Sequence, residues 1–175
     1  MNEKEAIALL ISTGCSPDVI EHCRAVAEYA KKIALAISEN AKRKEHPVNI
    51  DIDAVFLGAL LHDIGRSKTH GIGHAVAGAK IAVENGLDDK IINIIERHIG
   101  AGIPKGEASG LGLPEKDYLP VTIEEKIVAH ADNLMFGKNI GTVEELILNL
   151  RRKKLDERTI KRFIDLNNEI SSMMV

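Results

Sequence analysis

Four histidines and two aspartates interrupt the apolar faces of segments whose hydrophobic periodicity is helical. His22 stands between Val19 and Val26 at helical spacing, and Asp132 follows Val128 by four residues. An isolated carboxylate on an inward face costs several kcal/mol unless it is paired or binds a metal. A shared centre would supply the missing partner for every member of the set. The set is His22, His62, Asp63, His74, His98 and Asp132.

These donors are imidazole nitrogens and carboxylate oxygens, without a thiolate. Such a set suits divalent Fe, Mn, Co, Ni or Zn, and Mg is also compatible. Six ligands exceed what one tetrahedral zinc uses, and they suit two ions that share a carboxylate. The residues therefore predict one or two divalent metal ions, and a mononuclear site follows if His74 faces elsewhere. Each residue taken alone has an ordinary alternative, since most buried polar groups find protein partners.

Length and composition bound the class of protein. The chain has 175 residues, 45% hydrophobic and 28% charged, which predicts one soluble domain with a sizeable core. The net charge of −3 disfavours a generally basic nucleic-acid binder. Cys15 and Cys23 show no paired spacing, so we expect free thiols and a reducing cytoplasm. No apolar run approaches the roughly 20 residues of a membrane span, and the N-terminus lacks a signal-peptide pattern.

The periodicity predicts an all-α fold without strands. Capping signals set several boundaries: Ser16 with Pro17, Asp51, and the pairs Thr122–Glu125 and Thr142–Glu145 as capping boxes. Gly65 is expected to close a helix as a C′ residue. Residues 41–49, with His46 and Pro47, and residues 100–121 read as loops. The predicted helices cover 3–12, 16–40, 52–64, 73–85, 88–99, 122–136, a segment from 142, and 156–173.

The segment Leu60-Leu-His-Asp-Ile-Gly65 resembles the signature of the HD-domain metal-dependent phosphohydrolases in its HDIG form. The six residues match that family's H…HD…H…H…D pattern over residues 16–137. The resemblance implies an HD-domain-like helical bundle whose ligands converge on a mono- or dinuclear site. We expect a single domain over 1–175, with its core in about 16–137. Helices within 142–173 pack on that core or form a homodimer face.

Details of the motifs narrow the resemblance. The six-ligand pattern is similar to bacterial dinucleoside tetraphosphate hydrolases of HD type, which hold two irons. The segments Gly110–Pro114 and Ala129–Leu134 look more like an uncharacterised archaeal subfamily. Cyclic-dinucleotide HD-GYP enzymes carry a paired histidine near the fourth ligand and a Gly-Tyr-Pro loop. Here Ile99 follows His98 and the loop reads Gly102-Ile-Pro104, which disfavours that specificity.

The resemblance implies cleavage of a phosphoester or phosphoanhydride bond of a small nucleotide, or another phosphorylated substrate, by a metal-bound hydroxide. Asp63 would bridge two ions, and Arg66 would fork onto phosphate where many members carry lysine. Arg66 also reads as a surface residue at a helix end. Lys68 and Lys105 are further candidates for phosphate contact. The alternative is a regulatory module that keeps the fold and metal but binds a nucleotide without turnover, and a third reading uses the metal for stability alone.

Other features keep two interpretations each. The segment 100–121 is either a lid over the site or an ordered connection. The basic run Arg151-Arg-Lys-Lys154 is typical of a solvated helix end, and its functional alternative is docking of RNA or an acidic partner. His70 could substitute for His74 or line the entrance. His130 points to another helix face than Asp132, which favours a supporting or core role, and His46 is expected to be solvated.

Overall fold

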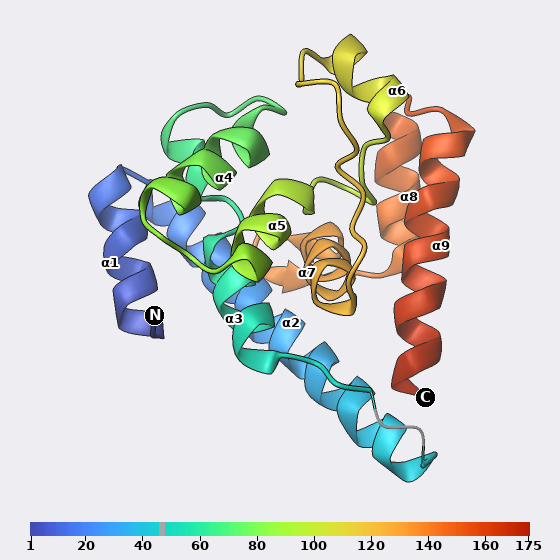
Figure 1. Ribbon diagram of the computed structural model, residues 1–175. Coiled ribbons are helices and arrows are strands. Elements are labelled where there is room, and N and C mark those ends of the chain that lie inside the picture. The colour runs from blue at the N-terminus through green and yellow to red at the C-terminus, as the bar shows by residue number, and fades with distance from the viewer. Residues whose placement is uncertain (46–47) are drawn as a thin grey trace.

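The computed structural model describes residues 1–45 and 48–175, and the predicted loop residues His46 and Pro47 lie outside the described residues. The chain is helical, as predicted, and short 3-10 turns η1 and η2 interrupt the α-helices (Figure 1). The elements are α1 (Glu3–Thr13), α2 (Pro17–Arg43), α3 (Ile52–Leu61), η1 (Ile64–Ser67), α4 (His74–Glu84), α5 (Asp89–Arg97), α6 (Lys105–Ala108), η2 (Ser109–Leu111), α7 (Ile123–Asn133), β1 (Met135–Phe136), β2 (Asn139–Ile140), α8 (Val143–Arg152) and α9 (Glu157–Met174).

The predicted N-terminal caps are present in the structure. The side chains of Ser16 and Asp51 accept hydrogen bonds from the backbone amides of Val19 and Ala54, at the starts of α2 and α3. Thr142 and Glu145 form the predicted capping box of α8.

The capping box predicted at Thr122 is half wrong. Thr122 caps α7 by accepting from the backbone amide of Glu125. The Glu125 side chain does not complete the box, since it accepts from the backbone amide of Val121 and from Arg97. An ion pair with a neighbouring helix has replaced a local bond that the sequence spacing alone could suggest.

The boundary predicted at Ile64 is wrong. α3 ends at Leu61, and a 3-10 turn over Ile64–Ser67 follows His62 and Asp63. Gly65 is not a left-handed cap either. It lies so close to α4 that a Cβ there would overlap the carbonyl oxygen of His74 and lie 2.5 Å from the nitrogen of Gly78. Glycine at this position therefore allows η1 and α4 to pack backbone to backbone.

Three other segments differ from the prediction. α2 continues to Arg43 rather than ending at Asn40. The helix predicted over 122–136 ends at Asn133, and a small antiparallel hairpin pairs Met135 with Ile140. The segment 100–121 contains α6, η2 and one β-bridge between Ile103 and Tyr118, so it is ordered along part of its length.

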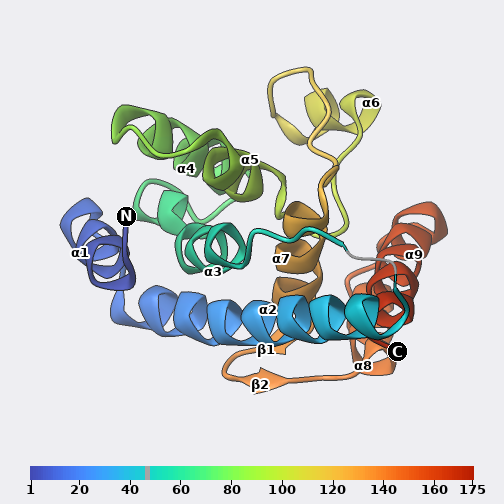
Figure 2. The same cartoon turned by 60° about the horizontal axis from the view of Figure 1, so that its bottom comes forward.

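The long helix α2 contacts the helices α1, α3, α7 and α9. Figure 2 shows α3 and α7 packed on it, α1 near its start and α9 near its end, with α4 and α5 on the far side of α3. One hydrophobic cluster joins these elements and includes Ile33 of α2, Leu60 of α3, Ile95 of α5, Ile127 of α7 and Ile160 of α9. α9 shares this core, which supports the proposal of a single domain. Within the described parts of the chain, no helix has both the length and the apolarity needed to cross a bilayer.

Candidate metal centre

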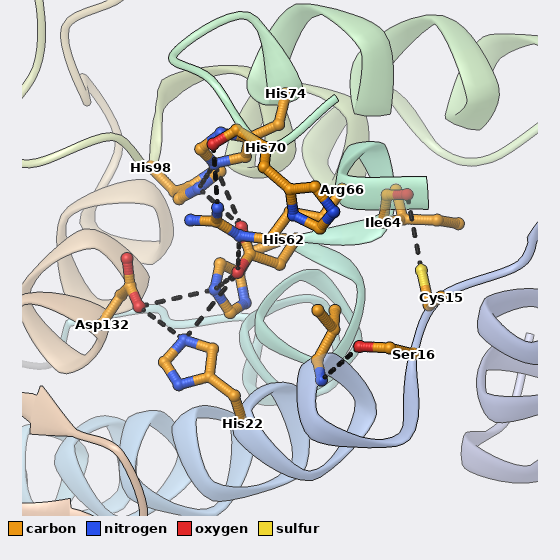
Figure 3. A network of polar contacts seen from close by, with 12 residues as sticks. Cys15, Ser16, His22, His62, Ile64, Arg66, His70, His74, His98 and Asp132 are labelled. Atoms are coloured by element: carbon orange, nitrogen blue, oxygen red, sulfur yellow. Dashed lines mark hydrogen bonds and ion pairs between the residues drawn. The ribbon is translucent and has the colours of Figure 1, made fainter. Parts of the chain in front are cut away.

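Five parts of the fold bring the six predicted residues to one place, and Figure 3 labels five of them, His22, His62, His74, His98 and Asp132. His22 lies in the first turns of α2, and His62 and Asp63 lie where α3 gives way to η1. The remaining three lie near helix ends: His74 begins α4, His98 follows α5, and Asp132 stands next to the last residue of α7. The structure therefore brings all six side chains together, His74 included. His62, Asp63, His74 and His98 are buried.

The cluster has two halves that meet at His62. In the first, the Oδ1 atom of Asp132 lies 2.9 Å from Nε2 of His22 and 3.5 Å from Nε2 of His62. In the second, Oδ1 of Asp63 lies 3.0 Å from Nε2 of His74 and 3.6 Å from Nε2 of His98. Oδ2 of Asp63 also lies 3.7 Å from Nε2 of His62 and 4.0 Å from Nε2 of His22, so Asp132 faces two imidazoles and Asp63 faces four. Two groups of three meet the spacing of a metal site: His22, His62 and Asp132, and His62, Asp63 and His98.

Backbone hydrogen bonds fix the orientation of three imidazoles. The Nδ1 atoms of His62, His74 and His98 lie 2.7, 2.8 and 2.7 Å from the backbone carbonyl three residues earlier. A carbonyl oxygen only accepts, so Nδ1 carries the hydrogen and donates it. In a neutral ring, the Nε2 lone pair then faces the centre. Metal-bound histidines are held by the same kind of outer hydrogen bond.

Two buried atoms in the cluster lack a partner. Nε2 of His62 and Oδ1 of Asp63 have no hydrogen bond among the described residues, although Oδ1 has imidazole nitrogens nearby. A buried polar atom without a hydrogen bond costs on the order of 1–3 kcal/mol. A divalent cation would use both atoms as ligands. The donor set, its spacing and these two atoms all fit such an ion.

The charges within the cluster support this fit. Burial raises the pKa of the Asp63 carboxyl, but the positive charge of His62 and contacts with His74 and His98 outweigh burial and hold that pKa well below its usual range. Asp132 behaves alike, with His62 and His22 as its partners. Burial lowers the pKa of His98. Burial also lowers the pKa of His62, but negative charges, chiefly that of Asp63, outweigh burial and hold that pKa well above its usual range. The centre therefore offers two ionised carboxylates and the neutral imidazole of His98, and a metal ion would displace the proton of His62.

Arg66 contacts the cluster directly. Its Nε lies 2.5 Å from Oδ2 of Asp63, and its Nη1 donates to the backbone carbonyl of His70 at 3.4 Å. Arg66, which the sequence predicts to bind phosphate, thus donates to a carboxylate in this structure. Its side chain is about one-third exposed, at 31%. Arg66 could both orient Asp63 and face a substrate.

The other predicted substrate-binding residues lie outside the cluster. Lys68 is exposed just after η1. Lys105 is exposed on α6, and its Nζ lies 3.7 Å from the carboxylate of Glu115 within the same segment. His70 is also exposed and contributes its backbone carbonyl to Arg66. The structure does not group these three side chains with the six.

Comparisons with known proteins match this arrangement. A family model described as the HD domain matches residues 19–136. The chain belongs to the HD domain family. This confirms the resemblance carried by the Leu60–Gly65 segment, and it places the cluster in a family whose members bind divalent metals.

The relatives of this HD domain differ in length and name. It is 51% identical over 175 residues to an uncharacterised protein of Methanocaldococcus jannaschii, covering 99% of both chains. It is 42% identical over 173 residues to a tRNA (cytidine(56)-2′-O)-methyltransferase of Thermoplasma volcanium, covering 99% of this chain but 48% of the methyltransferase. A ribonuclease Y of Pseudothermotoga lettingae is 30% identical over 146 residues, covering 82% of this chain and 23% of the relative.

The fold comparison agrees. The HD domain of the L. monocytogenes phosphodiesterase PgpH, solved in complex with cyclic-di-AMP, is similar with a TM-score of 0.54 and 17% identity. The match covers 97% of this chain and 95% of the other. At this identity the match shows a shared fold.

The HD domain also contains a supporting residue pair that the sequence analysis missed. Arg97 adjoins His98, and its Nη1 lies 3.0 Å from both carboxylate oxygens of Glu125 on α7. Glu125 is only 3% exposed. The pair ties the helix before His98 to the helix that carries Asp132. In the sequence, Glu125 stands three residues after Thr122, which indicates a capping box. Its pairing with Arg97 becomes visible only once α5 packs on α7.

His130 is buried on another face of α7, in line with the predicted core role. Burial lowers its pKa to about 4, so it is neutral near pH 7.

Proposed function

We propose that this HD domain is a metal-dependent phosphohydrolase that cleaves a phosphoester or phosphoanhydride bond of a small nucleotide. The orientation of the histidines carries the proposal. Three Nδ1 atoms are bound to the backbone, so three Nε2 atoms face ionised carboxylates at a buried centre. A protein core without a ligand gains nothing from this arrangement, because it leaves His62 and Asp63 atoms without hydrogen bonds.

The metal would be held by His22, His62, Asp63, His74, His98 and Asp132, as one or two divalent ions of Fe, Mn, Co, Ni, Zn or Mg. Such an ion supplies Lewis acidity and activates water at neutral pH. Asp63 faces His74 through Oδ1 and His62 through Oδ2. Arg66 holds the Asp63 carboxylate in place and has further N–H donors for a phosphate oxygen.

A second candidate substrate is the phosphodiester of RNA. The names of two kinds of relative, ribonuclease Y and a tRNA methyltransferase, support it. The exposed run Arg151–Lys154 at the end of α8 offers a local basic surface for an RNA strand. The net charge of −3 weighs against it, since RNA binding draws on many phosphate contacts. A third candidate function is that of a regulatory module, which would hold the metal and bind a nucleotide without hydrolysing it.

A product-resolved hydrolysis screen tests these candidates. It pairs nucleoside mono-, di- and triphosphates, cyclic nucleotides, dinucleoside polyphosphates and short RNA with each candidate metal. Asp63→Ala runs beside the wild type, and Asp53→Ala, which removes an exposed carboxylate on α3, the helix that precedes Asp63, is the matched control. Metal-dependent turnover that is lost in Asp63→Ala and kept in Asp53→Ala supports the phosphohydrolase, and the product identifies the bond.

Other outcomes separate the alternatives. Turnover confined to RNA moves the assignment to the second candidate. A metal-replete wild type that binds nucleotides without any product supports the regulatory module. A fully active, metal-replete Asp63→Ala protein contradicts the proposal outright.

A further inference from the structure

An apolar pocket is lined in part by residues that stand close in the chain to two members of the histidine cluster. It has a volume of about 610 Å³ and lies between the segment after His98 and helix α9. Its apolar walls include Ile72 and Ile99, which stand two residues from His74 and next to His98. Further walls come from Leu111, Leu155 and Phe163. None of the six cluster residues lines the pocket itself, but two of its walls are close neighbours in the chain of His74 and His98, which would hold the metal.

The segment between His98 and the pocket is fixed on both sides. Gly100 has a φ of 59°, and a Cβ there would lie 2.7 Å from Cζ of Phe163 on α9. Its carbonyl accepts from the Asn133 side chain at 2.9 Å, and Asn133 adjoins Asp132. A glycine therefore allows α9 to pack against the backbone beside the cluster. The position of the pocket relative to the cluster is set by these contacts.

The charge of the arginine that lines the pocket is matched by a glutamate, although Nε of Arg162 has no hydrogen-bond partner among the described residues. Arg162 donates through Nη1 and Nη2 to the two carboxylate oxygens of Glu107, at 2.9 and 2.7 Å. Asp156 accepts from the backbone amides of Arg158 and Thr159 and so caps α9. The described lining thus presents no unneutralised cation to a second phosphate group. An uncharged group fits it better.

Resting on the proposed function, we propose that this pocket receives the nucleoside part of a nucleotide whose phosphate lies at the metal centre. Pockets of 300–1,000 Å³ with apolar walls and a few polar groups are typical of small-molecule sites. A nucleobase has two apolar faces and a polar edge, which match apolar walls and the polar rim of Glu107, Thr159 and Arg162. α9 is then a specificity element of the site.

The structure offers variants that fill the pocket without disturbing the fold. Gly106 and Gly110 line it, neither has a positive φ, and a Cβ at either position meets nothing within 4 Å. Gly110→Leu and Gly106→Leu therefore place an apolar side chain in the space proposed for the base. Ser109→Leu is the matched control, because Ser109 is exposed, adjoins Gly110 and is not part of the lining.

The test is titration calorimetry on the Mn²⁺-loaded protein. The probes are inorganic phosphate, ribose 5-phosphate, the four nucleoside 5′-monophosphates and the four free nucleosides. We expect at least one nucleoside monophosphate to bind about tenfold or more tightly than ribose 5-phosphate. Gly110→Leu and Gly106→Leu remove this advantage and Ser109→Leu keeps it, while the affinity for inorganic phosphate is unchanged in all three.

The inference is overturned if no monophosphate binds more tightly than ribose 5-phosphate, or if both pocket-filling variants keep the preference. The free nucleosides separate this result from the proposed function. Nucleosides that bind the wild type and not the filled variants support the pocket, even if inorganic phosphate fails to bind and the phosphohydrolase is wrong. Phosphate binding and turnover without any preference for a base leave the phosphohydrolase standing and reject the pocket.

Discussion

Two arginine–glutamate pairs mark the difference between the metal centre and the pocket beside it. Both are two-contact pairs between helices distant in sequence. Glu125, which pairs with Arg97 behind the cluster, is 3% exposed, whereas Glu107, which pairs with Arg162 at the pocket, is 38% exposed. Water can replace the partner of Glu107 but not that of Glu125. The centre is therefore held by buried charge, and the rim of the pocket is free to adjust to a ligand.

The two regions are also built from different elements of the fold. The centre draws its side chains from α2, α3, α4, α5 and α7 and their ends, so every helix that meets there is needed. The pocket is lined mainly by the segment between Ile99 and Leu111 and by α9 with the residues just before it, and Ile72 is added from the segment before α4. If the account is correct, damage at the centre abolishes chemistry and damage at the pocket alters selectivity.

The largest expected effect is at the centre. His62→Ala removes a buried imidazole that belongs to both halves of the cluster. Metal ions contribute several kcal/mol of transition-state stabilisation, so turnover should fall by about 1,000-fold or more. Steady-state assays of His62→Ala beside Gly110→Leu measure this, and the latter should lose only about tenfold for the preferred nucleotide. Losses of similar size would remove the distinction between the regions.

The paired arginines should differ in stability. Glu125→Gln leaves Arg97 without its carboxylate in a mostly buried place, so the free energy of unfolding should fall by about 3 kcal/mol. Glu107→Gln acts on a pair whose glutamate is 38% exposed and should cost less, about 1 kcal/mol. Denaturant unfolding of both variants checks the difference. Equal decreases in the free energy of unfolding would mean that the two ion pairs stabilise the fold to the same extent.

Metal loading should stabilise the centre. An ion that binds only the folded chain adds about 2.7 kcal/mol at a concentration 100 times its Kd. For a chain of this size the melting temperature should rise by about 5 to 10 °C on Mn²⁺ loading and return after chelation. Thermal unfolding with and without Mn²⁺ measures the shift. His62→Ala should show little of it, and a wild type that does not respond would argue against a metal held by the folded state.

The smallest effect concerns Arg66. Its side chain orients Asp63 and is partly exposed, so Arg66→Ala should lower kcat/KM by about tenfold while metal content stays unchanged. Arg66→Lys keeps the charge without the fork and should recover part of the loss. Unchanged kcat/KM in Arg66→Ala would make it a surface residue at a helix end.

The parts of the molecule that the sequence predicted are those set locally. Helical periodicity, the caps at Ser16 and Asp51, and the six polar residues on apolar faces all depend on short spacings along one chain segment. Gly65 and Glu125 were misread because their roles depend on neighbours from other helices, α4 and α5. The pocket could not be predicted at all, since Phe163 meets Gly100 only after α9 packs against the core. Contacts between helices that are distant in the sequence cannot be predicted from the spacing of residues along one segment.

The measurement that bears most directly on the central claim is the metal content of the purified protein, taken by elemental analysis after loading and desalting. The account predicts about one or two divalent ions per chain in the wild type and in Asp53→Ala, and none in Asp63→Ala. A wild type without metal, or an Asp63→Ala protein with the same content as the wild type, would contradict it.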